Sequence, residues 1–208
     1  MVIAIDGPAA SGKGTLGRRI AEALGLSHLD TGLLYRAVAA RCLADGTLAD
    51  EAASVAAAHA LDLSTLDPEA LRGGEMGEAA SVVAARPAVR AALFDLQRRF
   101  AARPGGAVLD GRDIGTVICP DATVKLFVTA TPEVRAERRY RELAARGAGT
   151  SFEDVLADIR VRDARDSGRS AAPLMRADDA LLLDTTHLTV EGVFSEAMKL
   201  IRAKIGKV

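Results

Sequence analysis

The chain has little of what several classes of protein depend on, beginning with cysteine. Its two cysteines, Cys42 and Cys119, lie far apart, form no CxxC pair and have no His/Cys spacing typical of zinc. Two isolated thiols suit a reducing cytoplasm. Residues 1–6 lead directly into a loop, with no basic leader and no signal-type apolar run. No stretch approaches the roughly 18–20 apolar residues of a membrane span, so we expect a cytoplasmic protein that does not engage a membrane.

The chain also lacks a net positive charge. The formal net charge of the 208 residues is −1, whereas a protein that binds nucleic acid over a wide surface is usually strongly basic. We therefore expect no nucleic-acid partner, and any phosphate site must be a local cluster. Lysine occurs at only five positions, and the other basic residues are arginines, several of them in tight sets.

The hydrophobic pattern predicts an α/β fold. With 49% hydrophobic and 26% charged residues, the chain is typical of one globular domain spanning residues 1–208. Apolar runs of strand length occur at Val2–Asp6, His28–Asp30, Ala107–Asp110, Val124–Thr129 and Leu181–Asp184. Helical spacing lies between and after them, at Gly14–Leu24, Thr31–Leu43, Ala79–Phe100, Pro132–Ala145, Phe152–Ser167 and from Val190 to Ile205.

Strands that are almost wholly apolar and alternate with helices predict a five-stranded parallel sheet covered by helices on both faces. Thr31 is a good N-cap for the second helix. Two stretches, Ser64–Gly77 and Arg146–Ser151, look like loops.

A phosphate-binding loop stands between the first strand and the first helix. Its residues are Gly7, Pro8, Ala9, Ala10, Ser11, Gly12, Lys13, Gly14 and Thr15. Glycines let successive backbone N–H groups turn toward phosphate oxygens, and the helix N-terminus adds partial positive charge. Lys13 supplies a full charge for the β- and γ-phosphates, and Thr15 supplies a hydroxyl near the phosphates or Mg²⁺. The hydroxyl comes one position later than in the general motif, a GKGT form that resembles the nucleoside monophosphate kinase branch.

A P-loop alone does not define the reaction, but the rest of the sequence narrows it. A GTPase normally reads guanine with an Asn-Lys-x-Asp segment, and this chain has no asparagine. Its single glutamine, Gln97, lies in an amphipathic helical stretch, where we expect a solvated position rather than a water-positioning role. Phosphoryl transfer to a monophosphate brings two anions together, and arginines bind phosphate through two donors without losing charge. Arginines on several segments therefore favour a nucleoside monophosphate kinase.

Four further segments carry a family resemblance. They are residues 29–36 (LDTGLLYR), Ala79–Ser81 with Arg90, residues 109–117 (LDGRDIGTV), and residues 162–169 (RDARDSGR) followed by Ala172–Leu174. In this order behind the P-loop, they resemble bacterial cytidylate kinase from the first strand to the last helix. The resemblance implies an ATP-dependent, Mg²⁺-assisted transfer to CMP or dCMP in pyrimidine metabolism, by a monomer. It also implies an acceptor-binding segment at about 31–100 and a short lid at about 138–165.

The resemblance implies roles for individual residues. The CMP phosphate would be held by Tyr35, Arg36, Arg112 and Arg169, within an acceptor site that includes Thr31. Arg162 and Asp166 would lie near the ribose and the transferred phosphoryl group. Cytosine would be read by Ser81, Arg90 and Asp113. Arg138 resembles a lid contact to ATP. Catalytic roles would fall to Lys13, Arg162 and Arg138, with Thr15 near Mg²⁺.

Other interpretations of the same residues stay open at this point. Arg112 and Asp113 form a possible local ion pair, Tyr35 a possible core aromatic, and the arginines of residues 162–169 a possible salt-bridged helix face. Arg138 fits an exposed charged helix nearly as well. An adenylate, uridylate or shikimate kinase, or a nucleotide-binding protein without activity, are the competing functions.

The acceptor region departs from the family pattern. Many cytidylate kinases carry an inserted pair of strands there, for which Leu63–Glu75 is too short, and the family's Arg-Thr-Gln-like segment reads Arg72-Gly73-Gly74. Two polar side chains are thereby lost. We expect a looser acceptor site with a higher KM for CMP than longer relatives have. Steady-state kinetics with varied CMP measure this, and a KM in the low micromolar range would contradict it.

Overall fold

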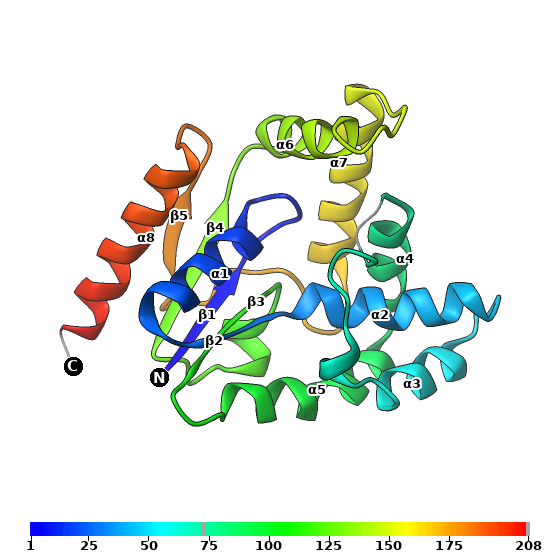
Figure 1. The fold of residues 1–208 in the computed structure, drawn as a ribbon, viewed down its shortest axis with the longest axis horizontal. Coiled ribbons are helices and arrows are strands. Elements are labelled where there is room, and N and C mark those ends of the chain that lie inside the picture. Colours follow the sequence, from blue (N-terminus) through cyan, green and yellow to red (C-terminus); the bar gives the residue numbers. More distant parts are fainter. Residues whose placement is uncertain (72–73, 207–208) are drawn as a thin grey trace.

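The structure, a computed structural model, describes residues 1–71 and 74–206, with only the backbone given at residues 74 and 75. Its centre is a five-stranded sheet in the order β2-β3-β1-β4-β5, and every neighbouring pair is parallel. The strands are β1 (Val2–Asp6), β2 (Ser27–Asp30), β3 (Ala107–Gly111), β4 (Val124–Thr129) and β5 (Leu181–Asp184). This confirms the predicted five-stranded parallel sheet, drawn in Figure 1.

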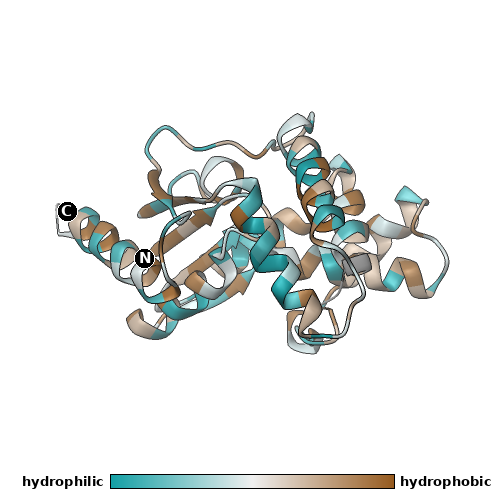
Figure 2. Ribbon diagram, turned by 90° about the horizontal axis from the view of Figure 1, so that it is seen from above, coloured by the Kyte–Doolittle hydropathy of each residue, from teal (hydrophilic) through white to brown (hydrophobic). Residues whose placement is uncertain are grey.

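Helices cover both faces of the sheet because alternate side chains of each strand point to opposite sides. Ile3 and Ile5 of β1 pack with α1 and α8, whereas Ala4 packs with α2 to α5. The helices are α1 (Lys13–Leu24), α2 (Thr31–Ala44), α3 (Glu51–His59), α4 (Gly74–Ala84), α5 (Pro87–Ala101), α6 (Pro132–Ala144), α7 (Phe152–Gly168) and α8 (Val190–Ile205). Figure 2 shows the central strands largely in brown, the hydrophobic end of the scale.

Three local expectations are wrong for identifiable reasons. The helical stretch at 79–100 is two helices, because Pro87 lacks an N–H and instead begins α5. Asp30, not Thr31, caps α2: its carboxylate accepts from the Gly32 N–H at 2.9 Å. The stretch at 64–77, expected as a loop, contains the end of a short 3₁₀ turn, Leu63–Thr65, and the start of α4. Residues 72 and 73, where the acceptor region departs from the family pattern, lie outside the described residues.

Helices α6 and α7 form a hairpin with a small apolar core of its own. Ala136, Leu143 and Val155 are buried between them. The rings of Tyr140 and Phe152 meet edge to face, with centroids 6.3 Å apart. In Figure 1 this hairpin stands beside the loop that connects β1 to α1, with α4 next to α7 and with α2, α3 and α5 below them. The part of the chain given in the structure contains no helix that is both long and apolar enough to span a membrane.

The strand ends bring polar residues together at one edge of the sheet. In the parallel register, Asp6 pairs with Gly111, and Asp110 pairs with Asp30. The P-loop leaves from β1, α2 leaves from β2, and residues 112–118 leave from β3. This carboxyl edge is where ligands bind in open parallel sheets, since the connecting loops diverge there.

The fold makes a prediction about stability that can be tested with one residue type. Leu93 on α5 is 0% exposed, whereas Leu182 on the edge strand β5 is 51% exposed. Leu93→Ala should lower the free energy of unfolding by about 2–5 kcal/mol, because it leaves a cavity between α5 and the core. Leu182→Ala should cost less than about 1 kcal/mol. Urea denaturation measures both, and equal losses would contradict this view of the core.

Candidate active site

The P-loop runs from β1 into α1 and leaves polar groups without partners. Gly12 has φ +89° and precedes α1 without a side-chain cap, so the first N–H groups of α1 have no side-chain acceptor at the N-cap. Gly7 passes so close to β4 that a Cβ there would lie 2.0 Å from the carbonyl oxygen of Val128. The Ser11 hydroxyl is buried and has no hydrogen-bond partner among the described residues. The loop therefore presents unpaired donors, as an anion site requires.

Lys13 is the cation of this loop. It is 9% exposed, and its Nζ donates to the carbonyl oxygen of Pro8 at 3.2 Å. Burial, followed by the nearby Arg112, lowers the pKa of Lys13 to about 7. The negative charge of a phosphate at the loop would favour the protonated, positively charged form of Lys13.

Two carboxylates stand beside the P-loop at the ends of β2 and β3. One oxygen of Asp30 accepts from Gly32, and Oδ2 of Asp110 lies 2.8 Å from Nε2 of His28. The other oxygens, Oδ2 of Asp30 and Oδ1 of Asp110, each lie 3.7 Å from a Cβ placed on Gly14. Burial and the neighbouring Asp110 raise the pKa of Asp30. These oxygens are the hard donors that Mg²⁺ prefers.

Four arginines crowd the wall across from the P-loop. Arg36, Arg112, Arg139 and Arg162 line a cleft of about 1190 Å³ that also includes Lys13 and Gly14. Burial, and then the charge of Arg112, lowers the pKa of Arg162 to about 10, and burial also lowers the pKa of Arg36. The buried Nε of Arg162 has no hydrogen-bond partner within residues 1–71 and 74–206. The cleft thus holds an excess of positive charge that an anion would relieve.

Asp166 of α7 balances part of this charge. Its Oδ2 accepts from Nε of Arg112 at 2.7 Å, and its backbone carbonyl accepts from Nε of Arg169 at 3.3 Å. Burial alone would raise the pKa of Asp166, but Arg112, Arg169 and Arg162 together lower it. One Nη2 donor of Arg169 is buried and unpaired in the described structure. The carboxylate therefore positions arginines without satisfying all of their donors.

The three residues predicted to read cytosine are buried and already hydrogen-bonded. Arg90 and Asp113 form an ion pair, with side chains 9% and 6% exposed. Arg90 also lies over the ring of Tyr35, 5.5 Å from its centroid. The Ser81 hydroxyl accepts from Arg165 of α7 at 2.9 Å. Tyr35, Ser81, Arg90, Asp113, Asp166 and Arg169 do not line the open cleft.

Two other predicted positions differ from expectation in detail. Thr31 lies 3% exposed at the start of α2, where its hydroxyl donates to the carbonyl oxygen of Asp110 at 2.8 Å. Gln97 is not on a solvated face: it is 2% exposed and donates to the carbonyl oxygen of Leu93 at 3.1 Å. The expected solvated position of Gln97 is therefore wrong. Gln97 lies on the same buried face of α5 as Leu93 and Phe100.

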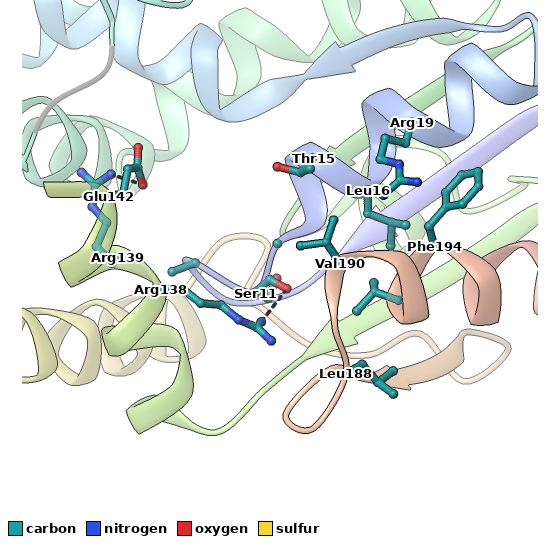
Figure 3. Close-up of a pocket in the computed structure, with 13 residues that line it drawn as sticks. Ser11, Thr15, Leu16, Arg19, Arg138, Arg139, Glu142, Leu188, Val190 and Phe194 are labelled. Carbon is teal, nitrogen blue, oxygen red and sulfur yellow. Dashed lines mark hydrogen bonds and ion pairs between the residues drawn. The ribbon is translucent and has the colours of Figure 1, made fainter. Parts of the chain in front are cut away.

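A second, smaller pocket adjoins the P-loop on the side of α8. It has a volume of about 300 Å³, and its walls include Leu16, Leu188, Val193 and Phe194 (Figure 3). Arg138 crosses one end of it, donating to the backbone carbonyl of Thr185 at 2.7 Å and to that of Ser11 at 3.5 Å. An apolar pocket with backbone polar groups at its rim suits a nucleotide base.

Sequence reasoning missed the importance of Arg135. It is 3% exposed and donates to backbone carbonyls of Ala9 in the P-loop and Ala130 after β4. It also forms a two-pronged ion pair with Asp163 of α7, at 2.9 and 2.5 Å. Arg135 thereby ties the P-loop to both helices of the hairpin. The sequence places several arginines on one helix, but it does not indicate which of them is buried.

A cleft lined by both a P-loop and a cluster of arginines defines an enzyme of the nucleoside monophosphate kinase class. A sequence profile described as cytidylate kinase matches residues 3–203. The chain is 73% identical over 206 residues to a cytidylate kinase of Azorhizobium caulinodans, covering 99% of this chain and 100% of that one. It is 71% identical over 204 residues to one of Xanthobacter autotrophicus, covering 98% of each. The chain belongs to the cytidylate kinase family.

The fold has a relative among solved structures as well. A crystal structure of an uncharacterized protein from Eubacterium ventriosum is similar with a TM-score of 0.54, covering 98% of this chain and 99% of that one. At 14% sequence identity, this likeness shows the shared fold alone.

The excess positive charge predicts that the unliganded protein becomes more stable when a cleft arginine is replaced by an uncharged residue. Arg162→Met should raise the free energy of unfolding of the unliganded protein by about 1 kcal/mol, because it removes a buried charge that lacks full pairing. Arg160→Met, two residues away on α7, is the matched control, since Arg160 is 61% exposed and pairs only at the surface with Glu133. Denaturant unfolding without nucleotides measures both. A stability loss in Arg162→Met larger than in the control would contradict the charge excess.

Proposed function

We propose that this cleft transfers the γ-phosphoryl group of ATP to CMP or dCMP, giving ADP and CDP or dCDP, through the residue roles set out below. The single observation that carries the proposal is the shape of the cleft. The P-loop and the arginine cluster face one another across it, with the buried Arg90–Asp113 pair beside it. Two phosphate-bearing ligands placed there would meet with their charges compensated.

ATP would lie along the P-loop. The backbone N–H groups of the P-loop, other than Pro8, which has none, bind the phosphates, and Lys13 donates to the β- and γ-phosphates. The base enters the pocket beside α8, next to Arg138 (Figure 3). Arg138 is held by Thr185 and Ser11, so it can place its guanidinium over the donor nucleotide without a large loss of side-chain freedom.

CMP would bring its phosphate to the arginines. Arg36 and Arg112 line the cleft and bind the phosphate oxygens, and Arg169, with its unpaired donor, completes the set. Tyr35 would lie between this phosphate site and the base site, since its ring packs against Arg90. Arg162 lies at the junction of the two phosphates, where charge builds up during transfer, and Asp166 orients the arginines toward the ribose side. Thr31 holds the start of α2 against β3.

The base would be read by Asp113, Arg90 and Ser81. Cytosine offers an amino donor to the carboxylate and two acceptors to the arginine and the hydroxyl. Uracil would place a carbonyl oxygen against the carboxylate of Asp113, setting two hydrogen-bond acceptors against each other. In the unliganded protein these groups pair with each other and with Arg165, so the base would have to exchange existing bonds for its own.

A magnesium ion fits the oxygen donors beside the P-loop. Thr15, with the inward oxygens of Asp30 and Asp110, would hold the ion and its waters. When bound, the ion would supply positive charge that offsets the negative charge of the ATP phosphates. All residues of the proposal come from one chain, so a monomer suffices. Both cysteines are buried and free, which suits a reducing cytoplasm.

The test of the base-reading assignment is substitution of Asp113. Wild type should produce ADP rapidly from ATP-Mg²⁺ with CMP and dCMP and slowly with UMP, AMP and GMP. Asp113→Asn should lower the CMP-to-UMP ratio of kcat/KM by about tenfold or more, because its amide can donate to the uracil oxygen. Asp121→Asn, which changes an exposed carboxylate paired with Arg98, is the control and should leave the ratio unchanged. An unchanged ratio in Asp113→Asn would refute the assignment.

A further inference from the structure

The carboxylate of Asp6 joins two segments that are distant in the sequence. Asp6 is the last residue of β1, immediately before the P-loop, and is 5% exposed. Its Oδ1 accepts from the backbone N–H of Ile114 at 2.8 Å, and its Oδ2 accepts from that of Gly115 at 2.7 Å. Neither the phosphate loop nor the arginine cluster uses this side chain, so its role needs a separate account.

The two donors belong to the first residues of a short helical segment. Ile114–Ile118 is a π-helical turn, and Asp113 is the residue that precedes it. The carbonyl oxygen of Asp113 accepts from Val117 at 2.8 Å and from Ile118 at 3.1 Å. A residue in this position commonly caps its own helix with its side chain. Asp113 makes no such cap, because its carboxylate pairs with Arg90.

We propose that Asp6 is a positioning residue for base selection, which caps the 114–118 turn from β1 and so leaves the Asp113 carboxylate to read the acceptor base. The proposal rests on the assignment of Asp113 as a base-reading residue under the proposed function. Without the carboxylate of Asp6, the N–H groups of Ile114 and Gly115 would be buried and unpaired, and Asp113 is the nearest side chain in sequence that could cap them.

Both ends of this contact are fixed in place. On one side, Asp6 ends β1, which pairs with β3 along one edge and with β4 along the other. On the other, a Cβ on Gly115 would lie 3.3 Å from Oδ2 of Asp6 and 3.1 Å from Cδ of Lys125. A side chain at residue 115 would therefore crowd both the carboxylate of Asp6 and the side chain of Lys125.

The contact requires an ionised carboxylate. Burial raises the pKa of Asp6 to about 6 even though the N–H groups of Gly115 and Ile114 lower it, and the charge of Asp113 raises it further. Lys13 and Cys119 are the other titratable groups that interact with it electrostatically. At neutral pH the carboxylate presents two acceptor oxygens to two donors. An asparagine in its place would present one acceptor and set an N–H group against an N–H group.

The test uses Asp6→Asn, which keeps the size of the side chain. At pH 7.5 its KM for CMP should rise about tenfold, and its CMP-to-UMP ratio of kcat/KM should fall by a similar factor, about what one lost charge-assisted hydrogen bond supports. The KM for ATP and the kcat at saturating CMP should change less than about threefold, because the P-loop and the arginines remain. Asp121→Asn again serves as the control.

A second variant covers the case in which Asp6→Asn fails to fold. Gly115→Ala keeps Asp6 but crowds its contact with the turn, and should raise the KM for CMP and lower the selectivity in the same direction by a smaller factor. Asp113→Asn is measured in parallel. If Asp113→Asn leaves the ratio unchanged, the base-reading assignment has failed. If Asp113→Asn lowers the ratio while a folded Asp6→Asn or Gly115→Ala does not, the positioning role of Asp6 alone is overturned.

Discussion

Excess positive charge at the carboxyl edge of a parallel sheet is the constraint on which the rest of this structure depends. Lys13 and the arginines of α2, α7 and the segment after β3 lie close enough that burial and mutual repulsion lower the pKa values of Lys13 and Arg162. Asp166 offsets part of that charge. The unfolded chain does not bear this repulsion, so the arrangement costs stability until phosphates enter the cleft.

The carboxylates around this cluster have three different roles. Asp166 orients arginines, Asp30 and Asp110 present oxygens beside the P-loop, and Asp113 pairs with Arg90 beside the cleft. Asp6 reaches the turn after Asp113 from the strand that begins the P-loop. Parallel register places Asp6, Asp30 and Asp110 at adjacent strand ends, which is why donor and acceptor sites can share one sheet edge.

The sheet and the P-loop could be predicted from the sequence because their signals are local. Apolar runs of strand length, a glycine-rich turn and Lys13 lie next to one another in the chain. The helix break at Pro87 and the cap at Asp30 were also visible in sequence, but a continuous helical pattern and a good alternative cap at Thr31 obscured them. Arg135 and Gln97 could not have been predicted, since burial of one polar residue among several on a helix depends on tertiary packing.

The most direct measurement compares CMP with cytidine as stabilisers of the wild-type protein in thermal unfolding. If compensation of the arginine cluster by phosphate is the main source of acceptor binding, CMP should raise the unfolding temperature in a concentration-dependent way. Cytidine at the same concentrations should raise it little, because the base alone leaves the excess charge in place. Equal shifts with both ligands would contradict the account and assign acceptor binding to the base pocket instead.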